Sequence, residues 1–173
     1  LVDVVEGRCR LHQAMIRDKR LPQLYLLPAA QTRDKTAIGP EDLVAVCENL
    51  RPDFDFLLID SPAGIERGFQ TAVAPADLVL VVTTPEVASV RDADWVIGLV
   101  EADGKGPAQL IINRIKPGLV RRGDMLSTSD VVDVLAVELI GIVPEDERIL
   151  VAANRGRPVA FDQHSPAGMA FRN

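Results

Sequence analysis

The sequence has few of the residues that build metal sites, disulfides or catalytic triads. It contains two cysteines and two histidines among 173 residues. Cys9 and Cys47 have no second cysteine at Cys-x-x-Cys spacing, so we expect thiols and neither a disulfide nor a metal site. His12 and His164 have no partner at metal-ligand or triad spacing, and we expect both on the surface.

Basic clusters and long apolar runs are also absent. The formal net charge is −6, and no block of Lys and Arg stands out. This charge argues against non-specific DNA binding, which requires a basic surface. No stretch reaches the roughly 18 apolar residues that a membrane-spanning helix needs.

The absence with most bearing on function is that of a phosphate-binding loop. Such a loop has the form GxxxxGK[ST], whose backbone amides and Lys surround the phosphates. The only Gly-Lys pair is Gly104-Lys105, which lacks the upstream Gly and the following Ser or Thr. It also ends a predicted helix instead of preceding one, so the 173 residues do not contain this loop.

Short apolar runs do alternate with amphipathic segments along the chain. The runs predict strands at residues 24–29, 54–60, 77–85, 108–115 and 139–146. The segments between them predict helices at residues 39–52, 64–76, 89–104, 127–138 and 147–156, with Ser127 and Asp130 in a capping box. Strands that are apolar throughout are typical of a parallel sheet covered on both faces. We therefore predict one domain over residues 1–173, an α/β fold with a doubly wound, mostly parallel sheet and helices on both faces.

Ligands of such sheets bind at the carboxyl ends of the strands, so the polar residues after each apolar run are the candidate site. Four clusters qualify: Asp60, Ser61, Pro62, Ala63 and Gly64; Thr83, Thr84, Pro85 and Glu86; Asn113 and Arg114; Pro144, Glu145 and Asp146.

Asp60 is the strongest single candidate in these clusters. A carboxylate at a strand end can hold Mg²⁺, usually through water, and Gly64 would let the backbone approach a phosphate and act as a hinge. The alternative is that Asp60 caps the next helix.

The other candidates have similar alternatives. Asn113 offers an amide donor and acceptor for a purine edge and Arg114 a planar group for stacking, but two polar residues after a strand are often only a loop. Glu145 and Asp146 also suit the first turn of a helix. Arg91 and Asp92 follow a helix start predicted at Ser89, and could belong to a capped helix or to an interaction surface.

Five stretches of the chain resemble the MinD/ParA family of deviant Walker ATPases, and among its members those that determine the septum site. They are IRDKRLPQLYLLPAAQTRDK, FLLIDSPAGIERG, TTPEVASVRDAD, RRGDMLS and IGIVPEDERILVAANRGRPV. The resemblance covers residues 1–167, nearly the whole chain. It is specific because the motifs recur in this order between the predicted strands and helices.

The resemblance implies a P-loop NTPase-like core and an ATPase acting in cell-division site selection. Members of the family dimerise face to face with ATP and Mg²⁺ between the subunits, and bind the inner face of the cell membrane from the cytoplasm through a C-terminal amphipathic helix. They recruit the division inhibitor MinC and are discharged by MinE. No nucleic-acid partner is implied.

The resemblance also implies a role for each candidate residue. Asp60 matches the Walker B aspartate, which holds magnesium and supports catalysis. Residues 61–66, including Ser61, Pro62, Ala63 and Gly64, match the second switch. Asn113 and Arg114 match the adenine-binding strand end, and Pro144, Glu145 and Asp146 match the loop over the base. Glu86 matches the dimer face, and Arg91 and Asp92 match the partner-binding helix.

Several family features find no match in these residues. They are the KGGVGKT-type loop with its signature Lys, the first switch, the last helix and the membrane-binding tail. We therefore expect a core truncated at both ends that does not hydrolyse ATP alone. The alternatives are a non-catalytic, truncated partner-binding module, and a related flagellar-number or chromosome-partition ATPase.

Overall fold

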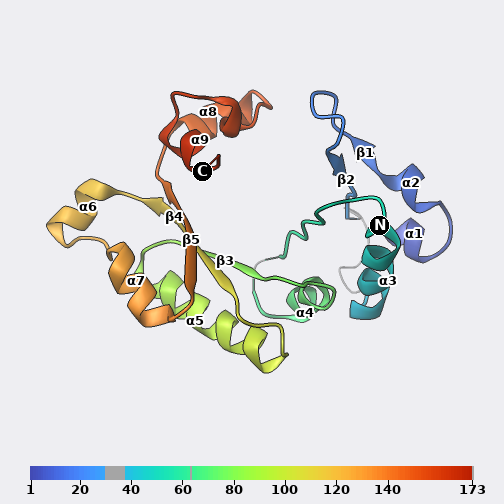
Figure 1. Ribbon diagram of the computed structural model, residues 1–173, viewed down its shortest axis with the longest axis horizontal. Helices are drawn as coiled ribbons and strands as arrows, with labels where there is room; N and C mark the ends of the chain where they lie inside the picture. The colour runs from blue at the N-terminus through green and yellow to red at the C-terminus, as the bar shows by residue number, and fades with distance from the viewer. Residues whose placement is uncertain (30–37, 63, 173) are drawn as a thin grey trace. The chain divides into compact units, whose positions relative to one another are not determined.

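The computed structural model describes residues 1–29, 38–62 and 64–172 (Figure 1). It contains two compact units, Leu1–Ala76 and Asp77–Asn173, which are described one at a time. The single domain expected from the sequence stays a prediction. The QTRDK motif at residues 31–35 and the candidate Ala63 lie outside the described residues.

A three-stranded parallel sheet forms the centre of the C-terminal unit. Its strands are β3 (Leu80–Thr83), β4 (Gln109–Ile115) and β5 (Glu138–Pro144), in the order β3-β4-β5. Three helices make the crossovers: α5 (Val87–Ala102), α6 (Pro117–Arg122) and α7 (Thr128–Leu135). This arrangement confirms the predicted α/β class with a parallel sheet.

Burial alternates along the strands of this sheet. Val81, Leu110 and Ile112 are buried, and α5 packs against both β3 and α7. Leu80 and Val82 of β3 and Ile140 and Ile142 of β5 are exposed, whereas the apolar residues of β4 are buried or half-buried. The continuous burial expected from these apolar runs is therefore wrong for β3 and β5, because the two faces of a strand are covered independently.

The chain after β5 folds back onto the sheet. It forms α8 (Arg148–Asn154), a 3₁₀ turn η1 (Val159–Phe161) and α9 (Pro166–Ala170). The α9 helix packs against β5 and η1. It begins where Ser165 accepts a hydrogen bond from the Gly168 N–H and where Pro166 takes the first helical position.

The described residues of the N-terminal unit form four helices and two short strands. Its elements are α1 (Val2–Val5), α2 (Leu11–Ala14), the two-residue strands β1 (Ile16–Arg17) and β2 (Tyr25–Leu26), α3 (Pro40–Leu50) and α4 (Arg67–Val73). The α3 and α4 helices pack together through Val46, Leu50, Phe69 and Val73, all buried. Cys9 and Cys47 are free thiols.

Of the two strands predicted in this unit, one does not form and the other is shorter than expected. Residues 54–60 form no ladder with any other part of the described chain, and Phe56 and Leu58 are 85% and 89% exposed. Within residues 24–29, only β2 is a strand, and it pairs antiparallel with β1. Apolar content can predict an extended segment, but a strand also needs a neighbour to accept and donate its backbone hydrogen bonds.

Two helix boundaries also differ from the prediction. The α5 helix begins at Val87 after Glu86, two residues before the expected start at Ser89. The α7 helix ends at Leu135 because Ala136 adopts a left-handed backbone with φ 53°. No helix in the described ranges combines the length and apolar character needed to cross a bilayer.

Candidate functional site

The carboxyl ends of β4 and β5 bring three of the predicted residues together. Asn113 and Arg114 lie near the carboxyl end of β4, and Glu145 directly follows β5. Because the strands are parallel, these ends meet at one edge of the sheet. The ladder register shifts between Ile112 and Ile115, so the two intervening residues leave the regular pairing.

Arg114 and Glu145 form an ion pair across this edge. The Arg114 Nε donates to Glu145 Oε2 at 2.8 Å and its Nη2 to Oε1 at 3.4 Å, while the Glu145 N–H donates to the Ile115 carbonyl at 3.0 Å. The guanidinium holds the pKa of Glu145 below its usual value. In turn, Glu145 raises the pKa of Arg114, to which the charge of Glu86 also contributes. Glu86 therefore acts electrostatically on the same site.

The backbone at Arg114 is unusual for a residue with a side chain. Its φ of 59° lies in the left-handed region, which glycine adopts more readily than arginine. The Asn113 Oδ1 accepts a hydrogen bond from the Arg114 N–H at 2.9 Å, which supports this conformation and leaves the Asn113 amide NH₂ available as a donor. Both residues lie within β4 and not in a loop, and Arg114 makes a specific ion pair, while their role in base binding stays a prediction.

Asp146 is directed to a different partner from its neighbour Glu145. Its Oδ2 accepts from Ser165 Oγ at 2.5 Å and from the Ala167 N–H at 3.3 Å, and its Oδ1 accepts from the Arg148 N–H at 2.9 Å. The Ser165 hydroxyl is the main reason why the pKa of Asp146 lies below its usual value. The bond to Arg148 also agrees with the alternative that Asp146 supports the first turn of a helix, since α8 begins at Arg148.

The magnesium candidate belongs to the N-terminal unit. Asp60 is the last of residues 54–60, its side chain is exposed, and no described residue forms a hydrogen bond or ion pair with it. The alternative that it caps the next helix is wrong, because α4 begins at Arg67 with Glu66 at its N-cap. A free, exposed carboxylate fits Mg²⁺, which needs only one or two protein carboxylates and keeps several waters.

Two further switch candidates stand close to Asp60 in sequence. Ser61 donates only to the neighbouring Pro62 carbonyl, at 3.3 Å. Gly64 has φ +93°, a conformation that suits the hinge role expected of it. No group of three or more His, Cys, Asp or Glu side chains that could hold a metal occurs among the residues that the structure describes.

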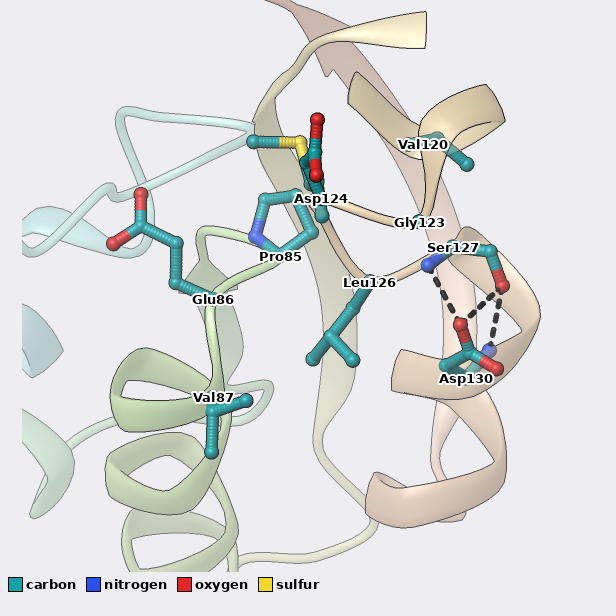
Figure 2. Close-up of a pocket in the computed structure, with 10 residues that line it drawn as sticks. Pro85, Glu86, Val87, Val120, Gly123, Asp124, Leu126, Ser127 and Asp130 are labelled. Carbon is teal, nitrogen blue, oxygen red and sulfur yellow. Dashed lines mark hydrogen bonds between the residues drawn. The ribbon is translucent and has the colours of Figure 1, made fainter. Parts of the chain in front are cut away.

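A pocket of about 430 Å³ in the C-terminal unit lies where α5 begins, and the predicted partner residues Arg91 and Asp92 are not among the residues that line it. Figure 2 shows Glu86 and Val87 at the start of α5 on one side of it, and Ser127 and Asp130 of α7 on the other. Arg91 and Asp92 follow on α5 and are exposed. The N-cap assigned to Ser89 is wrong, because that hydroxyl accepts from Thr84 Oγ1 at 2.9 Å instead.

Two features of this site were not predicted from the sequence. They are the ion pair of Arg114 with Glu145 and the hydrogen bond between Ser165 and Asp146. The second had a local signal, since Ser165-Pro166 has the serine and proline typical of a helix start. Nothing in the sequence signalled which carboxylate that serine would bind.

Several known proteins resemble this chain in sequence and in fold. No family model matches the chain. The septum site-determining protein MinD of Bacillus subtilis is 48% identical over 175 residues, which cover 100% of this chain and 65% of that protein. The MinD cell division protein of Aquifex aeolicus is 46% identical with a TM-score of 0.90, over 98% of this chain and 70% of that one, and a MinC:MinD complex from the same organism matches with the same score.

A more distant structure is that of the septum site-determining protein MinD from Pyrococcus horikoshii complexed with Mg-ADP. It is 28% identical with a TM-score of 0.83, over 99% of this chain and 69% of that one. The chain thus spans 65% of the length of its Bacillus relative, and it matches the Aquifex structure in sequence and fold over nearly all of its own length. This chain belongs to the MinD family of septum site-determining proteins.

Proposed function

We propose that this chain is the adenine-binding and switch portion of an ATPase that acts in cell-division site selection. The observation that carries the proposal is the meeting of Asn113, Arg114 and Glu145 at the carboxyl edge of β4 and β5 in a chain of the MinD family. The Mg-ADP complex of the Pyrococcus relative supports a magnesium-nucleotide ligand.

Each residue then has a defined task. The Asn113 amide would bind the edge of the adenine, and Arg114, held by Glu145, would form one wall for the base. Asp60 would hold Mg²⁺ through water, with Ser61, Pro62 and Gly64 in the segment that responds to the γ-phosphate. The bound metal supplies neutralisation of charge on the transferred phosphoryl group.

The partners follow from the same family membership. Arg91 and Asp92, exposed on α5, would bind a MinC-like division inhibitor, which the Aquifex MinC:MinD complex supports. Glu86 would face a second subunit in an ATP-dependent homodimer. A MinE-like activator would stimulate hydrolysis, and a C-terminal helix beyond these residues would attach the protein to the inner face of the membrane.

The first test is hydrolysis. We expect the 173-residue chain to show no magnesium-dependent phosphate release from ATP, because it contains no GxxxxGK[ST] sequence. The full-length polypeptide that carries this chain should hydrolyse ATP. Turnover by the 173 residues alone, or none by the full-length protein, would contradict the proposal.

The second test concerns the base. In the full-length protein, Asn113→Ala should weaken ATP binding about three- to tenfold, as expected for one lost hydrogen bond. Gln109→Ala is the matched control, because Gln109 stands at the opposite end of β4 and binds Glu138. Equal effects of the two substitutions would argue against a base site at Asn113.

A second candidate function is a partner-binding module that needs no nucleotide. It is favoured by one observation, namely that α5 and its pocket are built entirely within the C-terminal unit. Titration of the 173-residue chain with a purified MinC homologue separates the two candidates. Binding without nucleotide favours the module, and binding only by the ATP-loaded full-length protein favours the switch.

A further inference from the structure

Two consecutive carboxylates hold residues 144–148, here called the base loop, from opposite sides. Glu145 binds Arg114 at the end of β4, whereas Asp146 binds Ser165 and Ala167 in the chain after α8. The base loop is thus fixed between the sheet and the C-terminal segment, and both attachments lie within one compact unit.

Ser165 is the centre of the second attachment. It is fully buried, donates its hydroxyl proton to Asp146 Oδ2 at 2.5 Å, and accepts from the Gly168 N–H at 2.9 Å. One hydroxyl therefore joins the base loop to the start of α9 and has both hydrogen-bonding roles filled. A buried polar group of this kind is costly to leave with one partner removed.

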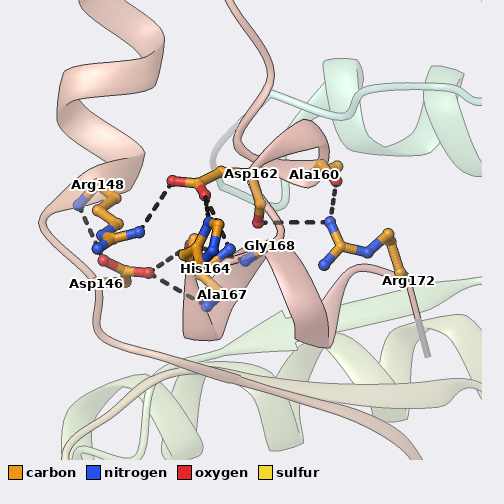
Figure 3. A network of polar contacts seen from close by, with 9 residues as sticks. Asp146, Arg148, Ala160, Asp162, His164, Ala167, Gly168 and Arg172 are labelled. Carbon is orange, nitrogen blue, oxygen red and sulfur yellow. Dashed lines mark hydrogen bonds and ion pairs between the residues drawn. The ribbon is translucent and has the colours of Figure 1, made fainter.

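A network of hydrogen bonds and ion pairs connects the residues around Ser165 (Figure 3). Asp162 accepts from the His164 N–H at 2.9 Å and binds the Arg148 guanidinium at 3.2 Å. Arg172 donates to the carbonyls of Ala160 and Asp162. These bonds hold residues 159–172 over the loop, so that Ser165 has little freedom to move away from Asp146.

Three hydrogen bonds from the protein occupy most of the acceptor positions of the Asp146 carboxylate. Both of its oxygens accept hydrogen bonds from the protein, so it differs from Asn113, whose NH₂ is available. The effect of Asp146 on the base is therefore indirect. Asp146 fixes the position of the neighbouring Glu145, and Glu145 fixes the orientation of the Arg114 side chain.

We propose that Ser165, acting through Asp146, is a positioning residue for the base loop, so that adenine binding requires the segment 159–172 to be docked. The inference rests on the proposed nucleotide function of the same edge. It adds a dependence on a segment that forms no hydrogen bond or ion pair with Asn113, Arg114 or Glu145 in the described part of the chain.

The test separates ligands that carry a base from those that do not. In the full-length protein, affinities for ADP and for inorganic tripolyphosphate are measured for the unaltered protein, Ser165→Ala and Gln163→Ala. Ser165→Ala should weaken ADP binding about tenfold, the size expected when a hydrogen bond to a charged group is lost, and leave tripolyphosphate binding unchanged. Gln163→Ala is the control, because Gln163 is exposed in the same segment and forms no hydrogen bond or ion pair with any described residue, and it should change neither affinity by more than about twofold.

The outcomes separate the two proposals. If the unaltered protein does not bind ADP, the proposed function fails and this inference with it. If it binds ADP but Ser165→Ala does not weaken that binding, or weakens both ligands equally, only the positioning role is overturned.

A second measurement serves if Ser165→Ala does not fold. Asp146→Asn keeps the size of the side chain but places an amide donor within the set of N–H and O–H donors around it. Amide hydrogen exchange at Glu145, whose N–H binds the Ile115 carbonyl, should then become faster in the 173-residue chain itself. Unchanged exchange at Glu145 would overturn the coupling.

Discussion

Ser127 and Asp130 form reciprocal hydrogen bonds at the start of α7. The Ser127 N–H donates to Asp130 Oδ2 at 2.8 Å, and the Asp130 N–H donates to Ser127 Oγ at 3.2 Å. The two side chains thus satisfy backbone donors that a helix start would otherwise leave without a partner. At the scale of single residues, this is a local interaction that can be measured by one substitution.

We expect Ser127→Ala to lower the free energy of unfolding of the C-terminal unit by about 1 kcal/mol. Urea unfolding followed by fluorescence of the single Trp95, which belongs to α5 in the same unit, is the measurement. Asp133→Asn is the control, since Asp133 is exposed on the same helix and outside its first turn. A loss as large for Asp133→Asn would show that the capping bonds are not the cause.

The sequence predicted this capping box because its partners are three residues apart. It could not predict the pair of Arg114 and Glu145, which are 31 residues apart, or that of Asp146 and Ser165, which are 19 apart. Distant side chains meet only after the strands have paired. The residue types at the strand ends were therefore predictable, and their partners were not.

At the scale of elements, two glycines in helices of the C-terminal unit have opposite surroundings. A Cβ on Gly168 in α9 would stand 2.5 Å from the Val159 carbonyl oxygen and 2.6 Å from that of Asp162, both backbone atoms. A Cβ on Gly98 in α5 would meet nothing within 4 Å. The first glycine is needed for close packing of α9 on η1, and the second is not needed for packing.

Alanine at these two positions should therefore change stability in opposite directions. Gly168→Ala should lower the free energy of unfolding by about 1–3 kcal/mol, since the clash forces the backbone apart. Gly98→Ala should raise it by about 0.5–1 kcal/mol, because alanine favours the interior of a helix. Denaturant midpoints of the two variants provide the comparison, and a shift in the same direction for both would contradict the packing argument.

The elements that the sequence predicted well are those with a complete local pattern. The β4 and β5 strands and α3, α5 and α7 lie close to their predicted positions. Residues 54–60 had an equally apolar pattern and form no strand, because strand pairing depends on a neighbouring segment that no local pattern supplies. The same limit explains the two-residue length of β2.

At the scale of the whole chain, five carboxylates among the described residues bind protons more weakly in the folded state than is usual. Their pKa values are lowered chiefly by hydrogen bonds from backbone N–H groups, serine hydroxyls or a guanidinium. They are Asp18, Asp130, Glu145, Asp146 and Asp162. An unfolded chain loses these bonds and takes up protons nearer the ordinary pKa values of 3.8 for Asp and 4.5 for Glu.

Acid should therefore destabilise the fold. The contribution of these groups is complete above the ordinary pKa values, and it is lost as the pH falls through the lower folded-state values, because the unfolded chain then binds more protons. Thermal unfolding midpoints should stay level from neutral pH to about pH 5 and decline below about pH 4. Glu145→Gln should reduce the slope of that decline while Asp133→Asn preserves it, and a midpoint that rises on acidification would contradict this linkage.

The register shift in β4 has an evolutionary consequence. Asn113 and Arg114 leave the regular ladder, whereas Leu110 and Ile112, just before them, are fully buried and hold the sheet together. Selection can therefore act separately on ligand recognition at positions 113 and 114 and on the stability of the sheet. Mutations at positions 113 and 114 can sample new ligand preferences while the sheet keeps its stability, so that a lineage can change what this edge recognises without first acquiring a new fold.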